Sequence, residues 1–110
     1  MADLVVEDVH WKKGEQGFQT FIIYDSDGRT PHNLTAHTYT FKFWAAGAGS
    51  LKGSGSLNIT SALGGVADYT VLSGDTDTVN DDGYLGEIIE TDTNLKTKTF
   101  RVYVLSSAPA

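Results

Sequence analysis

Three histidines are the first residues to test for chemistry, because imidazole serves as acid, base and metal ligand. They are His10, His32 and His37, and neither the H-x-H nor the H-x3-H spacing of zinc sites occurs among them. The chain also has no cysteine, so no thiolate can bind a metal or attack a substrate. We therefore interpret each histidine as an exposed or partly buried structural residue, and expect no metal and no cofactor.

The acidic residues offer no catalytic pair. Glu87 and Glu90 lie three positions apart in an expected strand, so their side chains point to opposite faces of a sheet. Serine and threonine are plentiful, but the G-x-S-x-G pattern of a hydrolase nucleophile is absent. A small enzyme is therefore the hypothesis with the least support, and we predict no catalytic residue.

The acidic loop 75–83 raises the question of calcium. An EF-hand loop that starts at Asp75 would need an oxygen ligand at its fifth place and glycine at its sixth. Those places hold Val79 and Asn80, so the EF-hand pattern fails. We interpret the loop as a solvated segment, and a looser calcium site between loops stays open as an alternative.

Composition and charge narrow the class of protein. The chain has 110 residues, 40% of them hydrophobic and 20% charged, as expected for one soluble globular domain. Its net charge of −6 argues against binding the nucleic-acid backbone. No apolar run is long enough for a membrane span, and the first residues lack the pattern of a secretory signal. We expect one domain over residues 1–105 and a flexible tail over 106–110.

The stretch 38–44 carries the clearest structural signal. Tyr39, Phe41 and Phe43 share one side of an extended chain, and Lys42 and Trp44 fall on the other. This period of two predicts a strand with an aromatic inner face and a mostly polar outer face. Such a strand needs neighbours and an opposing apolar sheet.

Alternating or apolar runs between turn signals predict seven strands. Their expected ranges are 4–11, 18–24, 38–44, 51–59, 66–72, 84–91 and 98–105. Seven short strands in a domain of about 100 residues are typical of two antiparallel sheets packed face to face. We therefore predict an all-β, immunoglobulin-like sandwich of about seven antiparallel strands, with a jelly roll or small barrel as the alternative.

The strand patterns also predict particular environments. Apolar residues on both faces of 18–24 indicate a strand in mid-sheet, and the glycines within 51–59 indicate a short or bulged edge strand. Tyr84 follows a tight turn and is expected to act as a tyrosine corner, its hydroxyl bonding to backbone. The residues expected to be buried together are Phe41, Phe43, Tyr69, Ile88, Phe100 and Val102.

Five residues are candidates for binding a partner. Trp44 lies on the polar side of its strand and Tyr103 on the outer side of the last strand, where an exposed ring could contact a protein or sugar. Gly53, Ser54 and Gly55 mark the expected weakly paired edge. Exposed edges invite pairing with another chain.

Several runs resemble the N-terminal domain of phage baseplate upper proteins. They lie at 11–14, 21–28, 33–43, 65–71 and 83–88, within residues 10–104. The similarity rests on strands and turns: an apolar strand, an S-D-G turn and an L-T-G step into an aromatic strand. This chain departs from that pattern at Glu15, where aspartate is usual, and at Ala36, where glycine is usual.

The resemblance implies an immunoglobulin-like module that attaches tail-tip parts to a phage tail or baseplate, with no catalysis. Its expected partners are other virion proteins, and its expected location is the virion after synthesis in the host cytoplasm. A carbohydrate-binding or adhesin module, with a host-surface glycan as ligand, is the alternative. That alternative would place aromatic rings such as Trp44 and Tyr103 together on one exposed face.

Overall fold

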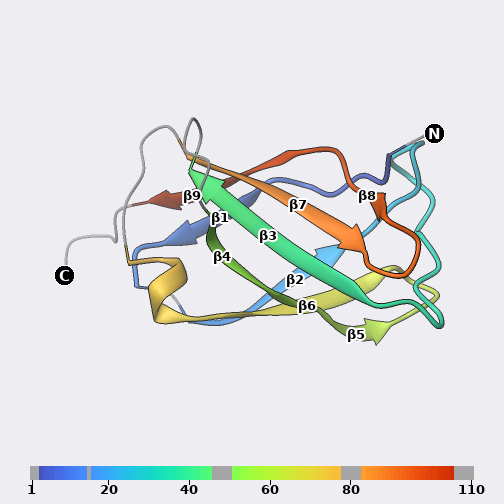
Figure 1. The fold of residues 1–110 in the computed structure, drawn as a ribbon, viewed down its shortest axis with the longest axis horizontal. Coiled ribbons are helices and arrows are strands. Elements are labelled where there is room, and N and C mark those ends of the chain that lie inside the picture. The colour runs from blue at the N-terminus through green and yellow to red at the C-terminus, as the bar shows by residue number, and fades with distance from the viewer. Residues whose placement is uncertain (1–2, 15, 46–50, 78–82, 106–110) are drawn as a thin grey trace.

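A computed structural model describes residues 3–14, 16–45, 51–77 and 83–105. Figure 1 shows the strands and one short 3-10 turn, η1 (Ser73–Asp75). Among the described residues the strands are β1 (Val9–Lys12), β2 (Gly17–Ile22), β3 (Tyr39–Ala45), β4 (Leu51–Ser56), β5 (Asn58–Ser61), β6 (Val66–Val71), β7 (Tyr84–Glu90), β8 (Leu95–Lys96) and β9 (Phe100–Leu105). No helix in this part of the chain has the length and apolar character of a bilayer span.

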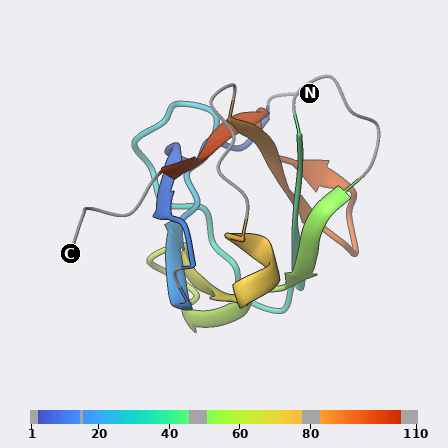
Figure 2. The same cartoon turned by 90° about the vertical axis from the view of Figure 1, so that its left-hand side faces the viewer.

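The strands form two sheets that enclose a common interior (Figure 2). The larger sheet has the order β1-β9-β7-β3-β4, with β8 paired to β7, and the smaller has the order β2-β6-β5. The second, fifth and sixth strands thus face a sheet built on β9, β7 and β3, which is the division of strands in immunoglobulin domains. The predicted all-β, immunoglobulin-like sandwich is confirmed.

Two expected strands are divided, and one pairing is parallel. The range 51–59 splits into β4 and β5, which lie in different sheets. The range 4–11 splits as well: Val5 forms an isolated bridge with Tyr24, while β1 pairs with β9 in parallel. With the short strand β8, which lies outside the expected ranges, the described residues form nine strands instead of about seven, and the pair β1–β9 is not antiparallel. Side-chain parity predicts the faces of a strand but not the residue at which the chain crosses between sheets.

The prediction that 18–24 lies in mid-sheet is wrong. Among the described strands, β2 pairs with β6 alone and forms an edge of the smaller sheet. Phe21 and Ile23 face the core, whereas Phe18 and Ile22 are 75% and 43% exposed. A strand with apolar residues on both faces can be buried on both sides. In β2, however, the face that carries Phe18 and Ile22 is exposed on the outside of the molecule.

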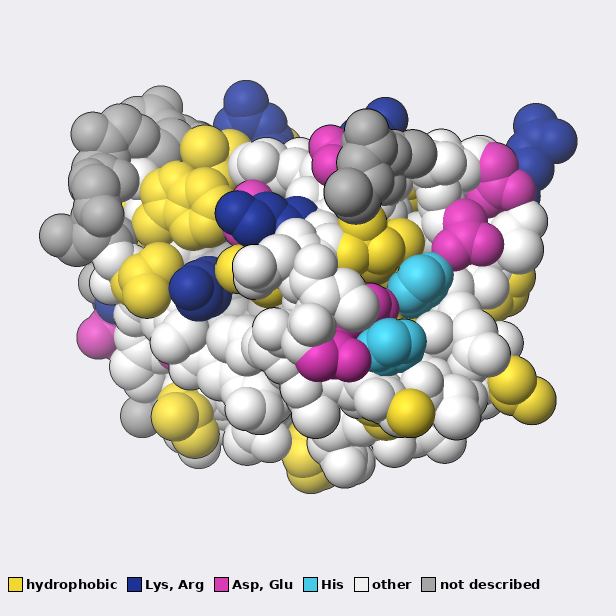
Figure 3. All heavy atoms as spheres, turned by 45° about the vertical axis from the view of Figure 1, so that its right-hand side comes forward, with side chains coloured by type: hydrophobic (Ala, Val, Ile, Leu, Met, Phe, Trp, Pro, Cys, Tyr) yellow, Lys and Arg dark blue, Asp and Glu magenta, His cyan; other side chains and the backbone are white. Residues whose placement is uncertain are grey.

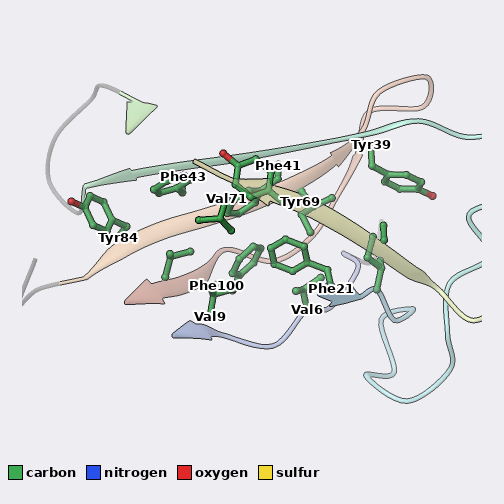
Figure 4. Close-up of a cluster of buried hydrophobic side chains, with 14 of the residues drawn as sticks. Val6, Val9, Phe21, Tyr39, Phe41, Phe43, Tyr69, Val71, Tyr84 and Phe100 are labelled. Carbon is green, nitrogen blue, oxygen red and sulfur yellow. The ribbon is translucent and has the colours of Figure 1, made fainter. Parts of the chain in front are cut away.

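The core is aromatic and lies between the two sheets (Figure 4). All six residues expected there are buried, with exposures of 4% or less. Phe41 lies at the centre, with ring centroids 4.8 Å from Tyr69 and 5.0 Å from Phe21. Trp11 is buried beside them, and its Nε1 donates a hydrogen bond to Gln19 Oε1 at 3.0 Å.

Tyr84 is buried at the start of β7. Its ring meets Phe43 edge-on at 5.7 Å, and the preceding Gly83 has a positive φ of 75° that suits a tight turn. Tyr84 thus opens a strand directly after a tight turn, as expected. The bond of its hydroxyl to backbone stays a prediction.

Candidate functional site

A buried carboxylate marks the best candidate site. Glu90 ends β7 on the inner face of the sheet, directly opposite Tyr39 of β3, and is 2% exposed. A carboxylate is almost never buried in this way unless it is paired and hydrogen-bonded. Its partners therefore define the site.

Both oxygens of Glu90 are engaged. Oε2 accepts a hydrogen bond from the Tyr39 hydroxyl at 2.5 Å and lies 2.9 Å from His32 Nε2. Oε1 accepts one from the Thr93 hydroxyl at 2.6 Å and lies 3.6 Å from His37 Nδ1. Two histidines and two hydroxyls thus surround one carboxylate.

Each histidine also meets a second carboxylate. His32 Nδ1 lies 2.7 Å from Asp25 Oδ1, and His37 Nδ1 lies 2.7 Å from Asp92 Oδ2. Figure 3 shows two neighbouring histidines with acidic side chains around them on one face of the molecule. We call the set the Glu90 network; its members are Asp25, His32, His37, Tyr39, Glu90, Asp92 and Thr93.

Three turns bring these residues together. The turn that follows Asp25 is closed by a hydrogen bond from Gly28 N to Asp25 O, and Gly28 has a φ of 72°. The turn 34–37 is closed by a bond from His37 N to Leu34 O. The β7–β8 hairpin turn is closed by Asn94 N, which donates to Glu90 O, with Asn94 at a φ of 60°. Glycine and asparagine are the residues that tolerate this left-handed backbone.

The network stabilises a charged pair. Burial alone would lower the pKa of His32, but its contacts with Glu90 and Asp25 outweigh burial and raise that pKa. Burial alone would raise the pKa of Glu90, but hydrogen bonds from Thr93, Tyr39 and His32 outweigh it and lower that pKa. His32 is thus favoured as a cation and Glu90 as an anion. Burial and the bond to Glu90 also raise the pKa of Tyr39, which keeps its hydroxyl a donor.

Part of the network has metal-binding geometry. One ligand atom each from His37, Glu90 and Asp92 lies within 4.8 Å of the others. Among the described residues, this is the group of histidines and acids whose atoms come close enough to share an ion. The side chains of His37 and Asp92 are 32% and 45% exposed, so an ion could enter from solvent.

Stability should depend on pH through His32 and Glu90. Since the pKa of His32 is raised from 6.5, its contribution is complete below 6.5 and is lost as pH rises through the folded-state value. Since the pKa of Glu90 is lowered from 4.5, its contribution is complete above 4.5 and is lost as pH falls through the folded-state value. We therefore expect both contributions to be complete between pH 4.5 and pH 6.5. Stability should decline when the pH moves well above or well below this range.

Urea melts in a chelating buffer, from about pH 3 to about pH 9, measure this dependence. His32→Asn should remove the part of the alkaline decline that His32 causes. His10→Asn is the matched control, because His10 stacks on Tyr103 at 4.9 Å and is not a member of the Glu90 network. An alkaline decline that is the same in wild type and His32→Asn would contradict this assignment.

Trp44, the first predicted binding residue, lies on the outer face of the larger sheet. Its cross-strand neighbours are Leu51 of β4 and Leu85 of β7. Trp44 and Leu85 are half-buried, and Leu51 is 54% exposed. The three side chains therefore form an apolar row on the face that also carries Lys42 and Glu87.

Gly53, Ser54 and Gly55 lie on β4, which is an edge strand as predicted, but the reason for the glycines differs. A Cβ at Gly53 would lie 2.4 Å from Asp75 Oδ1, and one at Gly55 would lie 3.0 Å from the Tyr69 ring. Both positions face the core: Gly53 lies against Asp75 and the ring of Phe43 on the neighbouring strand, and Gly55 lies against the Tyr69 ring of the opposite sheet, so a side chain would be crowded at both. Ser54 is exposed on the outer side.

Tyr103 is half-buried on β9, on the outer side as expected, and its ring is stacked on His10 at an interplanar angle of 21°. The structure brings none of the five candidates into the Glu90 network.

Sequence reasoning missed this network because its parts are distant along the chain. His32 and Glu90 are separated by 58 positions, and His37 and Asp92 by 55. One signal was present: Glu90 continues the inward parity of Tyr84, Gly86 and Ile88, and an acid at an inward position requires a partner. The parity argument against a Glu87–Glu90 pair is confirmed, since only Glu90 is buried.

The acidic loop is described only in part. Asp75 is buried and accepts hydrogen bonds from the Tyr69 hydroxyl at 2.7 Å and from Leu72 N at 2.9 Å. Asp77 pairs with Lys52 of β4. These contacts give both acids structural roles, while residues 78–82 of the expected loop lie outside the described residues.

Comparison with known proteins adds no family assignment. The sequence matches none of the protein-family models and none of the curated proteins with which it was compared.

Proposed function

We propose that this domain is a structural module of a phage or prophage tail or baseplate, where it joins other virion proteins. The observation that carries the proposal is the backbone at Ala36. Ala36 has a φ of 63°, a left-handed value that favours glycine, and it stands where the resembled family usually has glycine. A left-handed turn at this position would account for the family's glycine, and this agreement supports the proposal.

The other similar runs support the proposal by their positions in the sandwich. The S-D-G run follows β2 and forms a turn in which Asp27 Oδ1 accepts hydrogen bonds from Arg29 N and Thr30 N, each at 2.8 Å. The run 33–43 leads into β3, and 65–71 and 83–88 cover β6 and most of β7. The similarity thus involves strands of both sheets and the turns that orient them.

The apolar row on the outer face offers a surface for assembly. Trp44, Leu51 and Leu85 are neighbours across three strands, and β4 is an edge of the sheet. Tryptophan at the centre of a partly exposed apolar patch is a typical anchor in protein interfaces. Each copy would contribute a small interface, and repetition around a tail would multiply its effect.

Co-expression with the products of neighbouring genes tests this function. We expect tail or baseplate genes beside the coding sequence, and capture of one of their products by the tagged domain, identified by mass spectrometry. Trp44→Ala should weaken that capture at least about tenfold, whereas Ser54→Ala, also on the outer face, should not. Neighbouring genes without tail functions, or a sugar on a glycan array whose binding Trp44→Ala abolishes, would overturn the proposal.

The turn at Ala36 gives a separate test of stability. Ala36→Gly should raise the free energy of unfolding by about 0.5–1 kcal/mol, because it relieves a left-handed alanine. Ala62→Gly is the control, because Ala62 has no positive φ. This substitution should lower the free energy of unfolding by about 0.5–1 kcal/mol, because glycine gives the unfolded chain more conformational freedom. Urea melts of both variants measure the difference, and a loss of stability in Ala36→Gly would contradict the turn geometry.

A further inference from the structure

We propose that His37, Glu90 and Asp92 bind one divalent transition-metal ion of the zinc type. This inference goes beyond the proposed role in assembly and does not depend on it. It rests on three independent features of the Glu90 network: the spacing of donor atoms, the bonds that orient Glu90, and the balance of charge.

The donor atoms are those that such an ion prefers. Imidazole nitrogen and carboxylate oxygen bind zinc at about 2.0–2.2 Å, which places tetrahedral ligands about 3.4 Å apart. His37 Nδ1 and Glu90 Oε1 are 3.6 Å apart, close to that spacing. A nitrogen donor also favours zinc over calcium and magnesium, which prefer oxygen ligands alone.

The contact between His37 and Asp92 is the part that must change. At 2.7 Å, Nδ1 and Oδ2 are spaced for a hydrogen bond. An ion would replace the proton between them, that proton would leave to solvent, and the two atoms would separate by less than about 1 Å. Asp92 lies on the hairpin turn with a 45% exposed side chain, so it has room for that shift.

Glu90 is held in the orientation that a metal ligand needs. Ligating side chains are commonly fixed by hydrogen bonds to their remaining atoms. Here the Tyr39 hydroxyl and His32 hold Oε2, and the Thr93 hydroxyl holds Oε1 on the side of His37. Oε1 can accept a second interaction, because a carboxylate oxygen has two lone pairs. One ligand is therefore preorganised, and the two exposed ones can adjust.

The charge of the site also favours a cation. Asp25, Glu90 and Asp92 bring three carboxylates together, and their ion-pair partners among the described residues are histidines alone. A divalent ion at His37, Glu90 and Asp92 would offset the negative charge that these carboxylates bring together, and it would tie the turn before β3 to the β7–β8 hairpin. Solvent water would complete its coordination on the exposed side.

Calorimetric titration of zinc chloride into tag-free, EDTA-treated protein tests the site. We expect one ion per chain and, at saturation, a rise in the melting temperature of several degrees. His37→Gln should weaken binding at least about tenfold, and Asp92→Asn provides a second variant at an exposed position. Circular dichroism of both variants checks that they remain folded. Cobalt chloride adds a spectroscopic readout, because its visible absorption should change in wild type and not in His37→Gln.

His10→Gln is the matched control, since it removes a histidine that is not a member of the Glu90 network. It should leave affinity and stoichiometry unchanged. Absence of zinc binding, equal binding by folded His37→Gln, or an equal loss in His10→Gln would each overturn the proposal. Tighter binding of calcium than of zinc would also overturn it, because the imidazole ligand would then have no role.

Discussion

Phe41→Ala is expected to lower the free energy of unfolding by about 3–5 kcal/mol. Phe41 has no exposed surface, and its ring packs 4.8 Å from Tyr69, 5.0 Å from Phe21 and 5.4 Å from Phe43. These neighbours come from β6, β2 and β3, so the ring joins both sheets (Figure 4). Removing it would leave a cavity that rings from two opposed sheets can fill only in part.

Phe18→Ala is the matched control for this experiment. It removes the same side chain from a position that is 75% exposed on the outer face of β2, and should change stability by about 0.5 kcal/mol or less. Urea melts of both variants against wild type measure the difference. A loss below about 1 kcal/mol in Phe41→Ala would mean that the aromatic face of β3 does not form the core.

The core could be predicted from the sequence because it depends on a local rule. Side chains alternate along a strand, so Phe41 and Phe43 had to share a face with Tyr39. Aromatic rings on one face and mostly polar groups on the other then decide which face is inside. The same rule placed Phe100 and Val102 correctly on β9.

The neighbours of each strand could not be predicted in this way. Phe18 and Ile22 look like a second buried face, yet β2 is an edge strand and both are exposed. Alternation says which residues share a face and does not say whether another layer covers that face. Likewise, Gly53 and Gly55 looked like a weak edge, whereas their inner sides lie tightly against Asp75, Phe43 and Tyr69.

The Glu90 network was out of reach for a further reason. Metal and catalytic motifs are recognisable when ligands lie close together along one element, as two histidines on a helix do. Here His37 lies in the turn 34–37, Glu90 ends β7 and Asp92 lies in the β7–β8 turn, and pairing of β3 with β7 makes them neighbours. Only the inward position of Glu90 gave a local sign that a polar partner was needed.

Glu90→Ala is expected to lower the free energy of unfolding by about 3–5 kcal/mol, as is usual when one partner of a buried ion pair is removed. The substitution would leave the buried Tyr39 hydroxyl and the part-buried His32 Nε2 without the acceptor that they share. It would also deprive the β7–β8 turn of the bond that Thr93 donates. Glu90→Gln keeps the shape but presents an amide to donors, and should cost about 1–3 kcal/mol.

Glu87→Ala supplies the control for this carboxylate, because Glu87 lies on the same strand with its side chain on the opposite, half-exposed face, where it stands across from Lys42. It should change stability by about 0.5 kcal/mol or less. Urea melts in a chelating buffer at about pH 5.5, where His32 and Glu90 are both charged, separate this effect from any bound metal. Equal losses in Glu87→Ala and Glu90→Ala would show that the buried carboxylate does not organise this end of the sandwich. A loss confined to Glu90→Ala, and partly recovered in Glu90→Gln, would show that turns more than 50 positions apart are held together through one acid.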